Sequence, residues 1–156
     1  MDIDKRPNSL SKTMFNDYQY LLIPFIAAFS AQCFKMIMNA AKGKFTFRDL
    51  INYGGMPSGH AAAVTALAAM VGYFEGWTTS SFGIAMVLAV IVIRDAGGFR
   101  RLIGEHAEQI NLIVKKSLGS TVVLPVLKEK IGHTPLELFF GCLIGIVATT
   151  IYILLK

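Results

Sequence analysis

Long apolar runs separated by short polar stretches constrain this chain more than any other feature. Four runs are candidates for membrane-spanning helices: Tyr20–Ala41, Pro57–Trp77, Phe82–Ile93 and Pro135–Leu155. The second run would rise about 31 Å as a helix, enough to cross a hydrocarbon core of about 30 Å. Only 16% of the residues are charged, against about 25% in soluble domains. The sequence therefore predicts an all-α integral membrane bundle with about four spans.

The remaining segments fit one domain with a short extension. Residues 1–17 are polar and are expected to form an N-terminal tail, and residues 18–156 a single membrane-embedded domain. The third run is short for a span, so its helix should either continue through Arg94 and Asp95 or begin among the serines at 80 and 81. Residues 104–130 are amphipathic and predict a surface or re-entrant connecting helix.

Charge and cysteine content narrow the class of protein. The net charge is +5, but the cations are scattered between apolar runs, which argues against a nucleic-acid partner. Basic loops beside a membrane, or an anionic lipid substrate, account for the same charge. The two cysteines lie inside apolar runs and are interpreted as small buried hydrophobes. No cluster of potential ligands has clear metal spacing, so no metal is implied. No organic cofactor is expected either.

The distribution of Lys and Arg predicts the orientation of the bundle. The turn at residues 75–81 has neither residue type, whereas the long loop after the third run carries at least six such cations. Cytoplasmic loops are enriched in Lys and Arg. We therefore expect the starts of the second and fourth spans to face the cytoplasm, at the inner membrane if the source is bacterial. Three tail cations argue weakly for the opposite orientation: Lys5, Arg6 and Lys12.

The motif Pro57-Ser58-Gly59-His60 opens the second span. Free N–H groups at a helix start bind anions, and glycine lets a phosphate approach the backbone. Ser58 could donate to a phosphate oxygen, and His60 could protonate a leaving oxygen near neutral pH. The same residues also fit a plain helix start with Pro57 at the first position and Ser58 as its cap. The motif by itself favours neither interpretation.

The motif from His133 to Glu137 opens the fourth span. These two residues lie four apart on one helix face, so the carboxylate could fix the imidazole tautomer and leave the other ring nitrogen free to attack phosphorus. Thr134 and Glu137 also have the spacing of a capping box, with Pro135 at the first helical position. Taken alone, the motif favours the cap over the catalytic interpretation.

Several charged residues could act on a phosphate near these motifs. Lys35, near the end of the first span, fits either a buried phosphate ligand or a lysine that reaches the membrane interface. Arg100 and Arg101 could clamp phosphate, since guanidinium matches pairs of oxygens, or could anchor the cytoplasmic face. Asp95 could orient one of these arginines or pair with Arg94.

In their order along the chain, these motifs resemble the divergent type-2 phosphatidic-acid phosphatase family, distant relatives of lipid phosphate phosphatases and vanadium haloperoxidases. The resemblance covers about residues 32–152. It rests on Gln32 with Lys35, GGMPSGHAA, DAGGFRR followed by Gly104, Ala107 and Asn111, and GHTPLE followed by Gly141. The resemblance implies that His133 attacks phosphorus, that Glu137 orients it and that His60 protonates the leaving group. It also implies a set of phosphate-binding residues: Lys35, Ser58, Gly59, Asp95, Arg100 and Arg101.

The sequence departs from the wider phosphatase pattern at three points. Lys42 and Gly43 follow Lys35 at the spacing where the pattern has Arg-Pro, and Leu127 occupies the place of an arginine in the third motif. Arg100 or Arg101 could supply that charge from elsewhere. The chain also has about four spans where familiar membrane members have six, so a homodimer could complete the fold.

The predicted function is hydrolysis of a lipid phosphate or pyrophosphate in the membrane through a phosphohistidine intermediate. The first alternative is a non-catalytic phospholipid-binding or transport protein that keeps the phosphate pocket. The second is a structural membrane module whose motifs are helix caps.

Overall fold

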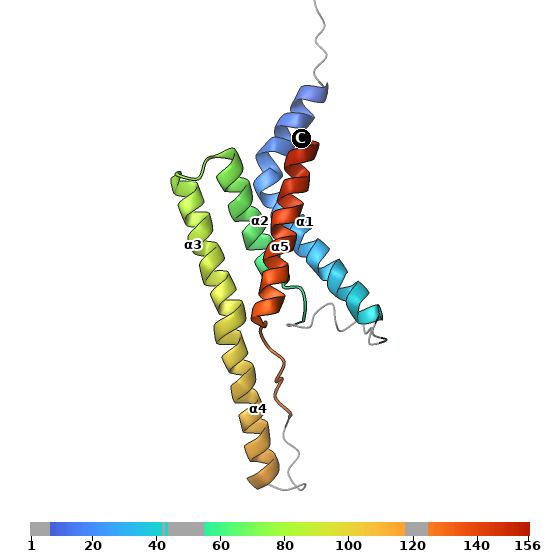
Figure 1. Cartoon of the computed structure of the whole chain (residues 1–156), viewed down its shortest axis with the longest axis vertical. Coiled ribbons are helices and arrows are strands. Elements are labelled where there is room, and N and C mark those ends of the chain that lie inside the picture. The colour runs from blue at the N-terminus through green and yellow to red at the C-terminus, as the bar shows by residue number, and fades with distance from the viewer. Residues whose placement is uncertain (1–6, 42, 44–54, 118–124) are drawn as a thin grey trace, which may run out of the picture.

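The computed structural model describes residues 7–41, 43, 55–117 and 125–156, with the backbone alone for 7–17 and 117. Its helices form an all-α membrane bundle, as predicted (Figure 1). They are α1 (Pro7–Ala41), α2 (Gly59–Phe74), α3 (Ser80–Arg94), the π-helical segment η2 (Asp95–Phe99), α4 (Arg100–Ser117) and α5 (Pro135–Leu155). α1 begins within residues 1–17, so part of the segment expected as a polar tail is helical.

Among the described residues, three stretches are long and apolar enough to cross a membrane: Tyr18–Ala41, Ser80–Lys116 and Pro135–Leu155. α2 has 16 residues and rises about 24 Å, so it is shorter than the predicted second span. Its start is fixed by the Ser58 cap, and Gly76, with φ of +108°, follows its end. α2 lies inside the bundle, in contact with α1, α3 and α5.

Small residues allow the helices around α2 to approach closely. Gly141 and Gly145 of α5 lie directly against the α2 backbone, and a Cβ at Gly145 would be 2.5 Å from the Ala62 carbonyl oxygen. This confirms the tight packing predicted from their GxxxG spacing. Fully buried alanines of α1 and α2 form the adjoining core: Ala27, Ala31, Ala62 and Ala66. Packing of this kind fixes the start of α5 relative to the start of α2.

The connecting helix differs from its prediction. α4 begins at Arg100 as a direct continuation of α3 and η2, whereas residues 104–130 were expected to form a separate surface or re-entrant helix. Residues 118–124 lie outside the described part, and residues 125–134 are not helical. Pro125 and Gly132, the latter with φ of +90°, both disfavour a helix there. In Figure 1, α4 extends past the start of α5, beside the chain that leads into α5.

Candidate active site

The starts of α2 and α5 and the π-helical segment η2 meet at one end of the bundle. The Ser58 N–H donates to the Glu137 carbonyl at 3.0 Å, which joins the start of α2 to α5. The His133 N–H donates to the Ala96 carbonyl at 2.8 Å, which joins the start of α5 to η2. Three motifs that are far apart in the sequence therefore lie together. The start of α1 and the C-terminus lie at the opposite end (Figure 1).

The π-helical turn provides the attachment point for His133. In an α-helix the Arg100 N–H would donate to the carbonyl four residues back, which is Ala96. Here it donates to the Asp95 carbonyl, five residues back. The Ala96 carbonyl accepts from the His133 N–H instead. Single π-helical turns are rare and are frequent at functional sites, so η2 marks this end of the bundle as a candidate site.

Glu137 makes both contacts that the sequence offered as alternatives, the helix cap and the pair with His133. Its Oε2 atom lies 3.0 Å from Nδ1 of His133, with 19% of the Glu137 and 11% of the His133 side chain exposed. The same oxygen accepts from the Thr134 N–H at 3.2 Å, and the Thr134 hydroxyl accepts from the Glu137 N–H at 3.3 Å. A capping box is therefore present together with a carboxylate–imidazole pair. With Nδ1 bound to the carboxylate, Nε2 is the ring nitrogen left for other chemistry.

At the start of α2, the serine has a structural role and the histidine is accessible. Ser58 is fully buried, and its Oγ accepts from the Ala61 N–H at 3.4 Å as an N-cap. A Cβ at Gly59 would lie 3.5 Å from the Ala28 carbonyl oxygen, so this glycine lies against α1. His60, in the first turn, is exposed. The cap interpretation therefore holds for Ser58, while the His60 side chain is exposed.

The charges around His60 come from η2, from the start of α4 and from the residues that lead into α5. Arg100, His133 and Asp95 all act electrostatically on its imidazole. Arg100 Nε lies 2.6 Å from Asp95 Oδ2, so Asp95 holds this guanidinium. Arg101 Nε instead binds Glu105 Oε1 at 3.0 Å, and both side chains are exposed. Arg100 thus acts electrostatically on His60, whereas the Arg101 guanidinium lies on the surface of α4.

Lys35 and Leu127 occupy very different places. Lys35 is buried, with 6% of the residue exposed, and a Cβ at Gly55 would be 3.0 Å from its Cε atom. Lys35 therefore lies against the chain that leads into Ser58. Leu127, at the place of the expected arginine, is bonded through its backbone to Asn111 of α4. Asn111 is roughly 17 Å along the helix from Arg100, so residue 127 lies far from the histidines. An arginine at position 127 would therefore be farther from them than Arg100 is.

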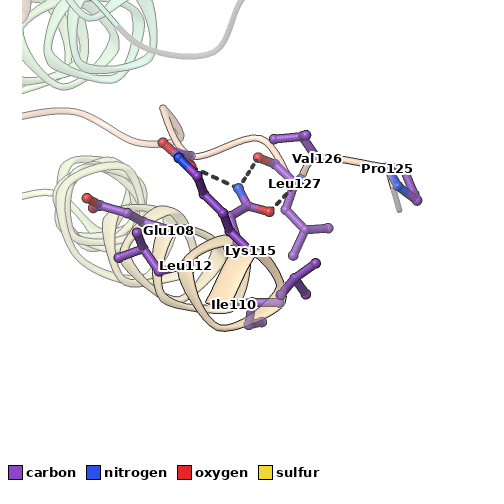
Figure 2. A pocket seen from close by; sticks show the side chains of 10 residues that line it. Glu108, Ile110, Leu112, Lys115, Pro125, Val126 and Leu127 are labelled. Carbon is purple, nitrogen blue, oxygen red and sulfur yellow. Dashed lines mark hydrogen bonds between the residues drawn. The ribbon is translucent and has the colours of Figure 1, made fainter. Parts of the chain in front are cut away.

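A groove of about 650 Å³ lies between α4 and residues 125–129 (Figure 2), and neither histidine motif lines it. Its lining includes Lys115 and Leu127. Within the part of the chain that the structure describes, no group of three or more His, Cys, Asp or Glu side chains could hold a metal ion. The candidate site is therefore defined by the helix starts and η2.

Comparison with known proteins places these motifs in a family. A family model described as "Divergent PAP2 family" matches residues 16–148, which include both histidine motifs and η2. The chain is 37% identical over 144 residues to "Uncharacterized membrane protein YuiD" of Bacillus subtilis (strain 168), covering 84% of this chain and 91% of that protein. No solved structure matches the chain. The family match covers most of the sequence, so this integral membrane protein belongs to the Divergent PAP2 family.

Proposed function

We propose that this chain hydrolyses a lipid phosphate or pyrophosphate through a covalent phosphohistidine at His133. The observation that carries the proposal is the 3.0 Å contact between the Glu137 carboxylate and Nδ1 of a largely buried His133. The exposed His60 is close enough for His133 and Arg100 to act electrostatically on its imidazole. A carboxylate bound to one imidazole nitrogen fixes the tautomer and makes the other nitrogen a better nucleophile. Membership of a PAP2-related family supports phosphatase chemistry.

In the first step, Nε2 of His133 attacks phosphorus and a P–N bond forms. The P–O bond to the leaving group breaks, its electron pair stays on the leaving oxygen, and His60 gives that oxygen a proton. Arg100, held by Asp95 at 2.6 Å, stabilises the phosphoryl oxygens. Lys35 adds positive charge from beneath the chain that leads into Ser58.

In the second step, a water molecule attacks the phosphorus of the phosphohistidine. His60, now neutral, takes a proton from the water, while the P–N bond breaks and its electron pair returns to Nε2 of His133. Inorganic phosphate leaves in this step for either substrate. The lipid product has already left in the first step, as an alcohol from a monoester or as a lipid monophosphate from a pyrophosphate. One water is consumed and both histidines return to their starting forms.

The surroundings of the site support a lipid as the substrate. Three large apolar side chains on η2 and the first turns of α5 are exposed: Phe99, Leu136 and Phe139. They belong to the elements that hold His133 and Arg100. Acyl chains could contact these side chains while the phosphate reaches the histidines, whereas a small soluble phosphate would make no use of them.

We further propose that the site faces the cytoplasm. α4, which continues from η2 on this side of the bundle, carries two lysines in its last turn: Lys115 and Lys116. Arg100 and Arg101 lie on the same helix. An excess of Lys and Arg is typical of cytoplasmic segments next to a span.

We also propose that two copies of the chain associate. α4 exposes isoleucines at positions 103, 110 and 113, a spacing of seven and three residues that is typical of helix pairing. Two copies held in the same orientation by the membrane would place these side chains opposite one another. In a background with Cys33 and Cys142 replaced by serine, Ile110→Cys should give a disulfide-linked dimer on mild oxidation. A chain that stays monomeric under these conditions would contradict this association.

A trapping experiment tests the function directly. The purified protein in detergent is given a panel of lipid phosphates and pyrophosphates, one of them labelled at the phosphate to be transferred, and is quenched in alkali. We expect released phosphate and an acid-labile label that His133→Ala abolishes. Vanadate that raises the melting temperature, without turnover or label on any substrate, would favour the non-catalytic lipid-binding alternative and overturn the proposal. The absence of any vanadate effect would favour helix caps alone.

A further inference from the structure

The segment of residues 125–132, here called the strap, runs along α4 and leads directly into His133. It has no helical structure, and its first six residues are exposed. Figure 2 shows its beginning, Pro125 to Leu127, beside α4. Since the strap contributes little buried surface, its few specific contacts with α4 must determine its position.

The far end of the strap is bound by one side chain of α4. The Asn111 Nδ2 atom donates to the Leu127 carbonyl at 2.9 Å and to Glu129 Oε1 at 2.8 Å, and Asn111 Oδ1 accepts from the Leu127 N–H at 3.0 Å. The carboxamide therefore satisfies both backbone groups of Leu127, as a neighbouring strand would. Only Asn and Gln carry a donor and an acceptor in this arrangement, and a shorter or charged side chain cannot reproduce it.

Two glycines bring the rest of the strap onto the helix backbone. Gly104 of α4 is buried, and a Cβ there would collide with the Glu129 carbonyl and lie 3.2 Å from the Ile131 carbonyl oxygen. A Cβ at Gly132 would lie 2.6 Å from the Arg101 nitrogen. The next residue, His133, donates to Ala96 of η2. The contacts thus follow one continuous line along α4 into η2.

We propose that Asn111 is a positioning residue of the candidate site, and that it acts by anchoring the strap that carries His133. The proposal rests on the hydrolytic function proposed above for its kinetic consequence. With the far end bound at Leu127, the strap lies against Gly104 of α4 and the His133 N–H stays bonded to the Ala96 carbonyl. Without the anchor, the strap lifts from α4, and the imidazole loses its fixed place between Glu137 and His60.

The test measures hydrogen exchange of the full-length chain in detergent, together with kcat and KM. In Asn111→Ala we expect at least tenfold faster exchange at the amides of both Leu127 and His133. The kcat value should fall at least tenfold, with KM changing less than about twofold, because the phosphate ligands on other elements remain. Gln109→Ala, an exposed neighbour on the same helix, is the matched control and should change neither quantity.

A negative charge introduced at position 111 allows a second variant to rescue the protection of His133 and the turnover. Asn111→Asp removes the donor and places a carboxylate beside Glu129, so exchange at His133 should rise as in Asn111→Ala. Adding Glu129→Gln supplies an amide that donates to the new carboxylate, and should restore at least half of the lost protection and turnover. A purely structural loss at position 111 would not respond to a change at position 129.

Gly104→Ala tests the same strap without touching Asn111. Alanine favours helix over glycine, so α4 should exchange more slowly while the strap and His133 exchange faster. Faster exchange at Leu127 with an unchanged His133 amide would overturn the proposal, because Asn111 would then hold only a surface segment. An active wild type whose Asn111→Ala variant keeps full kcat would also overturn it. If the wild type shows no turnover, the proposed hydrolysis is wrong, and exchange at His133 alone decides whether Asn111 positions it.

Discussion

Glu137→Gln separates the two roles that one carboxylate oxygen performs. Oε2 accepts from the Thr134 N–H and pairs with Nδ1 of His133. A glutamine oxygen can still complete the cap, so the free energy of unfolding should change by less than about 1 kcal/mol, the usual contribution of a helix cap to stability. What glutamine lacks is the negative charge that stabilises the imidazole as it becomes positive during attack on phosphorus.

The size of the catalytic loss follows from the strength of this hydrogen bond. Bonds to charged groups contribute about 1.5–3 kcal/mol, and bonds between neutral groups about 0.5–1.5 kcal/mol. Both side chains are mostly buried, so solvent screens the charge little and the difference is roughly 1–1.5 kcal/mol. A barrier higher by about 1.4 kcal/mol lowers the rate tenfold. We therefore expect turnover by Glu137→Gln to fall about tenfold at nearly unchanged stability.

Thermal unfolding in detergent and phosphate release at saturating lipid phosphate measure the two effects separately. Glu137→Ala removes cap and charge together, so it should lose both stability and turnover. Glu75→Gln is the control, because Glu75 is the C-cap of α2, at the end remote from its capped start. Full turnover by Glu137→Gln, with Glu137→Ala lowering mainly the melting temperature, would show that Glu137 is only a cap.

Three further outcomes are expected. Gly145→Leu should lower the free energy of unfolding by about 1–3 kcal/mol or more, since even a Cβ would lie 2.5 Å from the Ala62 carbonyl oxygen. Gly83→Ala is the control and should unfold like wild type, because a Cβ at Gly83 would meet open space. His60→Ala should strongly slow hydrolysis of a lipid phosphate whose leaving group is an alcohol, but much less that of a phosphate ester whose leaving group needs no proton. Equal losses on both substrates would show that His60 is not the general acid. Single cysteines are introduced into a chain without its native cysteines, and intact cells are treated with an impermeant thiol reagent. The reagent should label Thr79→Cys and spare the exposed Val126→Cys. The reverse pattern would place the site outside the cytoplasm.

The apolar runs and the helix-start motifs predicted most of the fold. Runs of this length predict helices in a membrane, and the GxxxG spacing of Gly141 and Gly145 predicted close packing that the structure confirms. The length of α2 could not be read from hydropathy, because its start depends on which residue caps the helix. Ser58 does so with its own Oγ, and the apolar run therefore begins before the helix does.

The residues of the candidate site could be proposed from the sequence, but their connections could not. Proline and histidine at both helix starts indicated where phosphate chemistry could occur. Only the folded chain shows that Arg100 acts electrostatically on His60 while Arg101 binds Glu105. Asn111 entered the sequence analysis only as part of the family resemblance, because a lone amide on an amphipathic helix is usually solvated and indicates no chemistry by itself. Its role depends on a contact with Leu127 that no local pattern encodes.

The pairing of Asp95 with Arg100 depends on the π-helical turn between them. Residues five apart in an α-helix point about 140° away from one another, so helix spacing did not favour this pair over Asp95 with Arg94 or Arg101. A π-helical turn, with hydrogen bonds to the residue five back, brings both side chains to the same side of the helix and lets them meet at 2.6 Å. The same turn frees the Ala96 carbonyl, and Ala96 is buried. Left unbonded, such a group would cost about 1–3 kcal/mol, but the His133 N–H satisfies it. The turn that aligns the arginine and the bond that holds the histidine therefore stabilise each other.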